Sequence, residues 1–138
     1  MTYYDTIYTI GCFDFFHEGH KNLLNTLKSR CKTLIIGVHN DDSLEKLKNI
    51  TKDKHQDEIT RITNVKTIAD HVFIIPNPDP SHYMKCMISK QHNKENACFI
   101  RADDNINFPS IEVVKELISI EYLPYTKGIS STKIRQNL

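Results

Sequence analysis

Apolar positions along the chain follow two alternating patterns, and the alternation predicts an α/β fold. Short, continuous apolar or β-prone runs are typical of strands that are covered on both faces. Between them, apolar residues recur at helical spacing. The expected strands cover residues 6–10, 32–39, 72–75, 97–100 and 120–123, and the expected helices begin near Lys21, Asp57, Ser81, Pro109 and Ser130. Strands that alternate with helices predict a single-domain, doubly wound parallel sheet of the Rossmann-like type, with about five strands and right-handed crossovers.

Two segments interrupt the alternation. Residues 44–56 are strongly polar and contain Lys46, Lys48, Lys52 and Lys54. This stretch is either a solvated loop or frayed helix, or a flexible basic arm that brings lysines to a phosphate. Residues 76–80 contain three prolines, which rule out regular structure there.

Composition narrows the class of protein. The 138 residues suit one domain, 1–138, and no linker or repeat divides them. A net charge of +1 does not indicate a nucleic-acid or membrane-surface protein, so any positive site must be built locally. The four cysteines lack the spacing of a zinc ribbon, a redox pair or a disulfide scaffold. With no signal-like N-terminus and no apolar run of membrane-spanning length, we expect a soluble, cytoplasmic protein that does not bind membranes.

The strand-to-helix turn Gly11–His20 is the first candidate site. In a parallel sheet this turn lies beyond the carboxyl end of a strand, where ligands bind, and the next helix offers unpaired N–H groups. His17 and His20 point the same way if the helix has begun, and Gly19 removes a Cβ that would keep a bulky anion away. These features predict an anion site, with polyphosphate as the anion. A histidine pair without a ligand, and a zinc site completed by further ligands, are the alternatives.

A second candidate lies near the C-terminus. Gly128 precedes three consecutive hydroxyl residues, Ser130, Ser131 and Thr132, at an expected helix start. They are either an ordinary helix cap or the wall of a phosphate site. If both helix starts lie at one edge of the sheet, they can hold one polyphosphate between them. The segment 101–104, which contains Asp103 and Asp104, opens on the same edge and either faces a ligand or forms a polar turn.

Together, the sequences Gly11-Cys12-Phe13-Asp14, His17-Glu18-Gly19-His20 and Gly128-Ile129-Ser130-Ser131-Thr132-Lys133-Ile134 resemble the cytidylyltransferase family of the HxGH nucleotidyltransferase superfamily. The resemblance covers essentially the whole chain and is closest to the short glycerol-3-phosphate cytidylyltransferases. It implies transfer of a cytidylyl group from CTP to a small phosphorylated alcohol, with glycerol 3-phosphate as the first guess. Pyrophosphate leaves, and Mg²⁺ accompanies the triphosphate. The resemblance also implies a homodimer and no nucleic-acid substrate.

The family assigns roles by motif. His17 and His20 would contact the phosphates through hydrogen bonds and positive charge, and Asp14 would hold the loop in shape. Lys46 and Lys48 would contact the acceptor phosphate, Lys46 with a catalytic part. The remaining nucleotide-binding positions implied by the resemblance are Gly11, Cys12, Phe13, Gly19, Asp103, Asp104, Tyr125, Gly128, Ile129, Ser130, Ser131 and Thr132.

The chain departs from the family pattern at several of these positions. Tyr125 stands where the family has an arginine, and Ala102 replaces a glycine. Arg61 is two positions out of register with a family arginine, and a one-residue gap precedes the lysine pair. Two alternatives therefore stay open. One is an adenylyltransferase that uses ATP on a sugar or other phosphate, because the first two motifs also resemble the domain that activates heptose phosphate. The other is a nucleotide-binding module with weakened catalysis.

Overall fold

The computed structural model describes residues 2–103, 108–124 and 130–136 and contains one five-stranded sheet in the order β3-β2-β1-β4-β5. Every neighbouring pair of strands is parallel. The strands are β1 (Tyr4–Gly11), β2 (Cys31–His39), β3 (His71–Ile75), β4 (Ala97–Ala102) and β5 (Ser119–Leu123). The expected doubly wound, Rossmann-like fold is confirmed.

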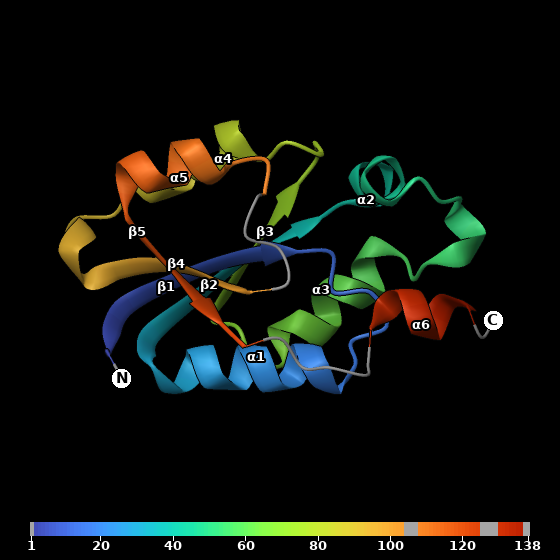
Figure 1. The fold of residues 1–138 in the computed structure, drawn as a ribbon, viewed down its shortest axis with the longest axis horizontal. Coiled ribbons are helices and arrows are strands. Elements are labelled where there is room, and N and C mark those ends of the chain that lie inside the picture. The colour runs from blue at the N-terminus through green and yellow to red at the C-terminus, as the bar shows by residue number, and fades with distance from the viewer. Residues whose placement is uncertain (1, 104–107, 125–129, 137–138) are drawn as a thin grey trace.

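Helices cover both faces of the sheet (Figure 1). On one face lie α1 (Glu18–Ser29) and α3 (Glu58–Lys66), and on the other lie α4 (Ser81–Ser89) and α5 (Ile111–Leu117). The remaining helices, α2 (Asp41–Lys48) and α6 (Ser131–Gln136), lie beyond the ends toward which the strand arrows point. The short 3₁₀ helices are η1 (Lys52–Lys54) and η2 (Lys94–Asn96). Among the described residues, no helix has the length and apolar character needed to cross a membrane.

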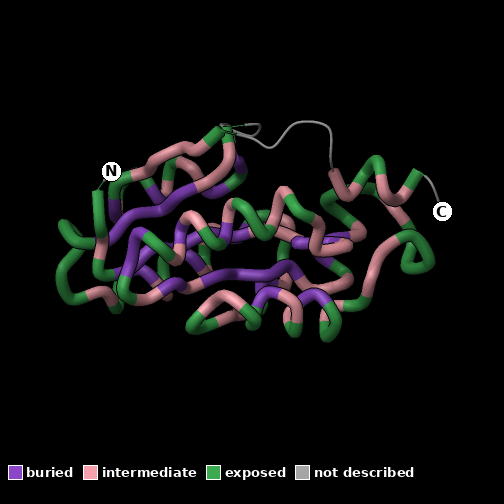
Figure 2. Tube along the Cα trace, turned by 90° about the horizontal axis from the view of Figure 1, so that it is seen from below, coloured by how far each residue is buried: buried purple, intermediate pink, exposed green. Residues whose placement is uncertain are grey.

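The buried residues form two clusters, one on each face of the sheet, and Figure 2 shows burial following the strands between the helix layers. The α1/α3 core contains Ile7, Leu24, Leu27, Val38, Val65 and Ile100. The α4/α5 core contains Tyr8, Ile10, Met84, Ile88, Phe99, Phe108 and Val114. Because strand side chains alternate between the faces, each central strand contributes to both cores. This explains why the strands read as continuous apolar runs.

Several boundaries differ from those expected. The first half of the polar stretch 44–56 is helical: the Asn40 side chain accepts a hydrogen bond from Ser43 N at 2.8 Å and caps α2, and Leu44 is fully buried. Of the alternatives, the helix describes this half better than the loop or the flexible arm, because one buried leucine and a side-chain cap fix it. Helix α1 begins at Glu18, ahead of the expected Lys21.

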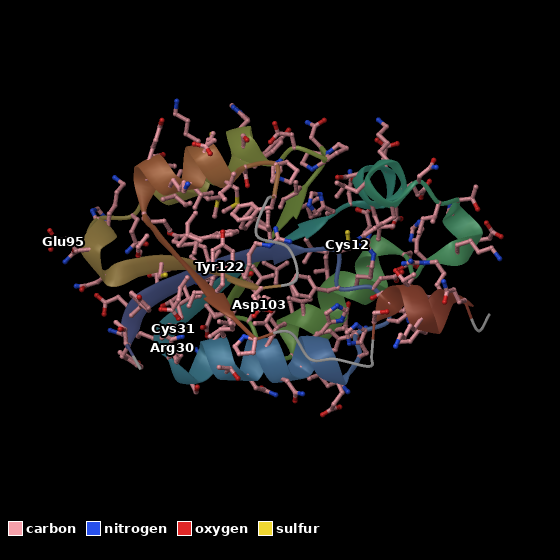
Figure 3. The ribbon with its side chains drawn as sticks, viewed as in Figure 1. Cys12, Arg30, Cys31, Glu95, Asp103 and Tyr122 are labelled. Carbon is pink, nitrogen blue, oxygen red and sulfur yellow. The ribbon has the colours of Figure 1, made fainter. Side chains whose placement is uncertain are left out.

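The sheet order places a topological switch point between β1 and β4. The chain leaves β1 toward one side and reaches β4 only after building β2 and β3. In open parallel sheets, ligands bind in the crevice outside the carboxyl ends of the strands at this point. Figure 3 shows Cys12 near this edge, whereas Arg30 and Cys31 lie at the opposite end of the sheet.

Candidate active site

A cavity of about 770 Å³ opens at the carboxyl edge of the sheet. Its wall comes from the loop after β1, the start of α1, the ends of β2 and β4, the end of α2, and α6. The structure therefore brings together segments that are far apart in the sequence. Of the candidates from sequence, those in the cavity wall are Gly11, Cys12, Phe13, Asp14, His17, Gly19, His20, Lys48, Ser130, Ser131 and Thr132.

His17 and His20 form the N-terminal capping box of α1. The Nδ1 atom of His17 accepts hydrogen bonds from the backbone N–H groups of Gly19, at 3.1 Å, and His20, at 3.4 Å. Reciprocally, His20 Nδ1 accepts from the backbone N–H of His17 at 3.3 Å. Because both Nδ1 atoms accept, each neutral ring carries its proton on Nε2. The rings stack with centroids 3.7 Å apart, so the cavity wall holds two adjacent N–H donors.

Both imidazoles are neutral at pH 7. Burial, followed by the charges of His17 and Lys48, lowers the pKa of His20 to about 3. Burial also lowers the pKa of His17. Neutrality removes the repulsion that two stacked cations would suffer. The rings therefore offer hydrogen bonds, and the nearby positive charge comes from Lys48.

The loop after β1 has a strained backbone. Phe13 and Phe15 have φ of 52° and 58°, in the left-handed region that bulky residues rarely adopt. The Phe13 ring is buried and lies edge-on to the His20 ring, with centroids 5.4 Å apart. Strain of this kind persists only where the surroundings enforce it.

Asp14 supplies that enforcement. Its side chain, 1% exposed, accepts a hydrogen bond from Gln56 N at 2.9 Å and forms an ion pair with Arg135 at 2.8 Å. Its backbone carbonyl accepts from the Ser131 hydroxyl at 2.6 Å. Asp14 thus connects the loop after β1 to the segment after η1 and to α6. These contacts give a physical basis for the loop-holding role that the resemblance implied.

The three consecutive hydroxyls of the second candidate have different partners. Ser130 Oγ accepts a hydrogen bond from Lys133 N at 3.0 Å, which is an ordinary helix cap. Ser131 Oγ donates to Asp14, as described above. Thr132 is exposed and lies in the cavity wall. Ser130 therefore caps the helix, and all three hydroxyl residues lie in the cavity wall.

The site has the composition and placement of a nucleotide site at a switch point, and the comparison with known families agrees. Residues 8–137 match the family described as Cytidylyltransferase-like. The chain belongs to this family. It is accordingly a nucleotidyltransferase.

Two relatives show similarity in sequence, and one solved structure shares the fold. The chain is 30% identical over 133 residues to a glycerol-3-phosphate cytidylyltransferase of Bacillus spizizenii, covering 96% of this chain and 95% of the relative. It is 35% identical over 80 residues to the bifunctional protein HldE of Caulobacter vibrioides, but these cover only 16% of that protein. The fold matches a lipopolysaccharide core biosynthesis protein from Thermoplasma volcanium with a TM-score of 0.63 at 17% identity, over 91% of this chain and 99% of that one.

Within this nucleotidyltransferase, the structure separates the two lysines of the lysine pair. Lys48 lies in the cavity wall. Lys46 does not; its ammonium group lies 2.9 Å from the Asp42 carboxylate on the exposed surface of α2. The difference arises because residues two apart point to opposite sides of a helix, whereas in an extended arm they would share a side. Only Lys48 is positioned to meet a ligand in the cavity.

Arg61, treated in the sequence analysis as out of register, is fully buried at the edge of the site. It donates to the backbone carbonyls of Cys12 at 3.0 Å, His39 at 2.7 Å and Gln56 at 3.0 Å. It also donates to the Asp41 carboxylate at 2.9 Å. One guanidinium thus fixes the ends of β1 and β2, the start of α2 and the segment after η1. The sequence carried no signal for this beyond an arginine on an otherwise apolar helix face.

Sequence reasoning also missed His39, Arg101 and Arg135, which all lie in the cavity wall. His39 is buried at the end of β2, with Nδ1 2.7 Å from the Ser43 hydroxyl. Burial, with the charges of Arg101, Arg61 and Lys48, lowers its pKa to about 4. His39 and Arg101 lie at the carboxyl ends of β2 and β4, and Arg135 lies in α6. That position was a usable but weak signal.

The remaining candidates lie elsewhere. Asp103 is exposed, its backbone N–H donates to Leu123 O at 2.8 Å, and it is not part of the cavity wall; Figure 3 marks its position. Asp104, Tyr125, Gly128 and Ile129 fall outside the described residues. The burial of Cys12 raises the pKa of its thiol, against the opposing charges of Lys48 and Arg61, so this cavity residue is a neutral thiol.

Proposed function

We propose that this nucleotidyltransferase transfers a cytidylyl group from CTP to a small phosphorylated alcohol, with glycerol 3-phosphate as the first acceptor to test. The observation that carries the proposal is the stacked pair His17 and His20, whose occupied Nδ1 atoms leave two Nε2–H donors for phosphate oxygens. The Bacillus relative, which matches along nearly its whole length, supports CTP and glycerol 3-phosphate as the substrates.

In the proposed reaction, an oxygen of the acceptor phosphate attacks the α-phosphorus of CTP. A new P–O bond forms, the bond from the α-phosphorus to the bridging oxygen of the β-phosphate breaks, and pyrophosphate leaves. Attacking and leaving oxygens lie roughly in line in such transfers, and catalysis consists mainly of positioning and charge stabilisation. The two Nε2–H groups and the Lys48 ammonium stabilise the charge that develops on the transferred and departing phosphates. Asp14 and Arg61 position the loop and do not react.

We propose that Thr132 and the backbone around Gly11 and Gly19 contribute the remaining nucleotide contacts. All three lie in the cavity wall. Glycines at this edge allow the nucleotide to approach the backbone closely. For the candidate residues that lie outside the described ranges, including Tyr125 and Gly128, we propose the nucleotide-binding roles that the resemblance implies.

We propose Mg²⁺ as the cofactor, bound mainly through the triphosphate. The described residues contain no cluster of three or more histidine, cysteine or carboxylate side chains suited to a metal. Asp14, the carboxylate in the cavity wall, already accepts hydrogen bonds from Gln56 and Arg135. Phosphate oxygens and water are the ligands that Mg²⁺ prefers, and the ion would neutralise charge on the leaving pyrophosphate.

A second candidate is adenylyl transfer from ATP to a sugar phosphate. The match to HldE over 80 residues favours keeping this candidate. A matrix of CTP, ATP, GTP and UTP against glycerol 3-phosphate, phosphocholine, phosphoethanolamine, pentitol phosphates and heptose phosphates, with pyrophosphate release as readout, separates the two. We expect release with CTP and glycerol 3-phosphate. Release with ATP alone would select the second candidate.

The same matrix tests whether the protein is an enzyme of this kind at all. CTP binding without pyrophosphate release for any pair would favour the binding module with weakened catalysis. We further propose a cytoplasmic homodimer, on the resemblance. Light scattering coupled to gel filtration would check the dimer, and a monomeric mass at micromolar concentration would contradict it.

A further inference from the structure

Gln56 contacts the loop after β1 through both its backbone and its side chain. Its backbone N–H donates to the Asp14 carboxylate at 2.9 Å. Its side-chain Oε1 accepts a hydrogen bond from the backbone N–H of Phe15 at 3.1 Å. Two consecutive residues of the loop are therefore held by one residue that lies more than 40 positions later in the chain.

The backbone carbonyl of Gln56 is fixed by two buried side chains. Arg61 Nε donates to it at 3.0 Å, and His55 Nδ1 lies 2.6 Å from the same oxygen. Arg61 is fully buried, and the side chain of His55 is 1% exposed and also reaches Glu45 of α2, at 2.8 Å through Nε2. Because both its N–H and its C=O are bonded, the backbone of Gln56 has one position. Its side chain therefore loses little further conformational entropy when it presents its oxygen to the loop.

Phe15, which receives this contact, has a strained backbone. Its φ of 58° lies in the left-handed region, where the Cβ of an L-residue crowds a neighbouring carbonyl oxygen. Its ring is only half-buried and lies 6.0 Å from the guanidinium carbon of Arg135. Burial of the ring therefore does not explain the strained conformation. The hydrogen bond to Gln56 acts directly on the strained residue, whereas the contacts of Asp14 act on its neighbour.

The conformation of Phe15 sets the direction in which the chain enters α1. The next residue, Phe16, stacks on the His20 ring with centroids 6.1 Å apart and an interplanar angle of 21°. Phe13, on the other side of the turn, lies edge-on to the same ring. His17 follows and shares the capping box with His20. A return of Phe15 to negative φ would move Phe16 and His17 relative to Phe13, so the His20 ring would lose support from one of its neighbours.

Resting on the proposed function, we propose that Gln56 is a positioning residue of the transfer reaction. Its side-chain oxygen holds Phe15 in the left-handed conformation and thereby keeps the Nε2–H groups of His17 and His20 directed into the cavity. Gln56 acts through the loop, since within the part of the chain that the structure describes it does not line the cavity. Donors aimed at the transition state lose most of their effect when they are displaced by about 1 Å. The loss should therefore appear in kcat more than in CTP binding.

The test is a double-mutant cycle at positions 56 and 15. Gln56→Met removes the acceptor oxygen and keeps the length of the side chain and the backbone groups of residue 56. It is introduced beside the native Phe15, beside Phe15→Gly and beside Phe15→Ala. Glycine adopts a positive φ without strain, whereas alanine lacks the ring as glycine does but keeps the Cβ that creates the strain. Gln91→Met is the matched control, because it removes a glutamine oxygen that accepts from the Tyr8 hydroxyl at 2.8 Å, outside the described cavity wall.

We expect Gln56→Met to lower kcat about tenfold or more beside Phe15 and beside Phe15→Ala, with the Kd for CTP within about threefold of the matching parent. Beside Phe15→Gly the same substitution should lower kcat less than about threefold, because the loop keeps its conformation without the hydrogen bond. Gln91→Met should keep kcat within about twofold of wild type. No loss beside Phe15, equal losses beside glycine and alanine, or an equal loss in Gln91→Met would overturn the inference.

Thermal unfolding is measured for every variant, so that misfolding is recognised. If Gln56→Met does not fold beside Phe15 but folds beside Phe15→Gly, the strain at residue 15 is the reason, and the inference is supported. If it folds in neither background, the effect of Gln56 does not depend on the conformation of residue 15, and the inference is wrong.

Nuclear magnetic resonance of the protein alone separates failure of this inference from failure of the proposed function. In Gln56→Met we expect the amide proton of Phe15 to exchange with solvent at least about tenfold faster and the imidazole nitrogen signals of His20 to shift. Gln91→Met should change neither. If the wild type releases no pyrophosphate with any substrate pair, yet these signals change as expected, the proposed function fails and the positioning role of Gln56 stands. Unchanged signals in Gln56→Met would overturn that role whatever the activity.

Discussion

The carboxylate of Asp14 lies 2.8 Å from the guanidinium of Arg135, 121 positions later in the chain. The pair joins the loop after the first strand to the last helix, and both residues line the cavity. Arg135 additionally donates to Lys54 O at 2.9 Å. The arrangement of the two phosphate-site candidates relative to one another therefore depends on this nearly buried ion pair, together with the hydrogen bond from Ser131 to the Asp14 carbonyl.

Replacing Arg135 tests this dependence. Arg135→Met leaves a carboxylate that is 1% exposed without its cation, so we expect the free energy of unfolding to fall by about 3 kcal/mol. We also expect the KM for CTP to rise, because α6 is no longer held against the loop. Urea unfolding and steady-state kinetics measure the two effects. A double-mutant cycle with Asp14→Asn should return a coupling energy clearly above zero, and additivity would contradict the pairing.

The histidine pair can be tested with a substitution that preserves the helix cap. His17→Asn retains a good N-cap side chain but lacks the Nε2–H donor. We expect kcat to fall by ~10²–10³ with little change in melting temperature. His17→Ala, which removes both functions, should lose stability as well. Near-normal activity of the asparagine variant would show that the imidazole serves only as a cap.

The lysines of α2 provide a matched pair. Lys48→Met should lower kcat/KM by roughly 10-fold or more, because it removes a cation from the cavity wall in a site where charge stabilisation dominates. Lys46→Met should change kcat/KM by less than about threefold, since an exposed pair of this kind contributes little. The same assay, run on both variants, decides between the structure and the family-based assignment. A larger effect at Lys46 would restore that assignment.

The free energy of unfolding should fall as the pH is lowered below the ordinary histidine pKa. In the folded protein the pKa of His20 is about 3 and that of His39 about 4, both below the ordinary histidine value of 6.5. At pH values between each folded-state pKa and 6.5, the unfolded chain binds more protons than the folded one, so acid favours unfolding. Above pH 6.5 the contribution of these histidines to stability is constant. Urea midpoints measured from pH 7 to pH 4.5 should decrease. His39→Gln should show a smaller decrease than wild type, and parallel curves would contradict the assignment.

Arg61 should be the most sensitive position for stability at this edge. Arg61→Met leaves three backbone carbonyls and the Asp41 carboxylate without their donor, and we expect a loss of about 3–5 kcal/mol. Arg61→Lys retains charge but cannot donate to four acceptors in a fork, so it should recover only part of this loss. Chemical unfolding monitored by far-UV circular dichroism measures both. A near-neutral effect would mean that water replaces the guanidinium.

Much of the fold followed from local patterns. Continuous apolar runs and helical stripes located the five strands and the helices that cover them, because burial on two faces or on one stripe leaves a direct record in the sequence. The HxGH and hydroxyl-rich motifs located part of the cavity wall, because the residues of each motif are close together in the chain. The polar stretch after β2 left a helix, a loop and a flexible arm as alternatives, and the Asn40 cap and the burial of Leu44 decide for a helix in its first half.

The sequence by itself thus determined the fold class, the family and the two short motifs at the carboxyl edge. The tertiary structure decided which side chains meet there. The helical rotation of α2 puts Lys48, and not Lys46, in the cavity wall. The path of the chain also brings Asp14 to Gln56 and Arg135, 42 and 121 positions away, and places Arg101 in the same wall. Such contacts depend on the path of the whole chain across the sheet, which local periodicity does not encode.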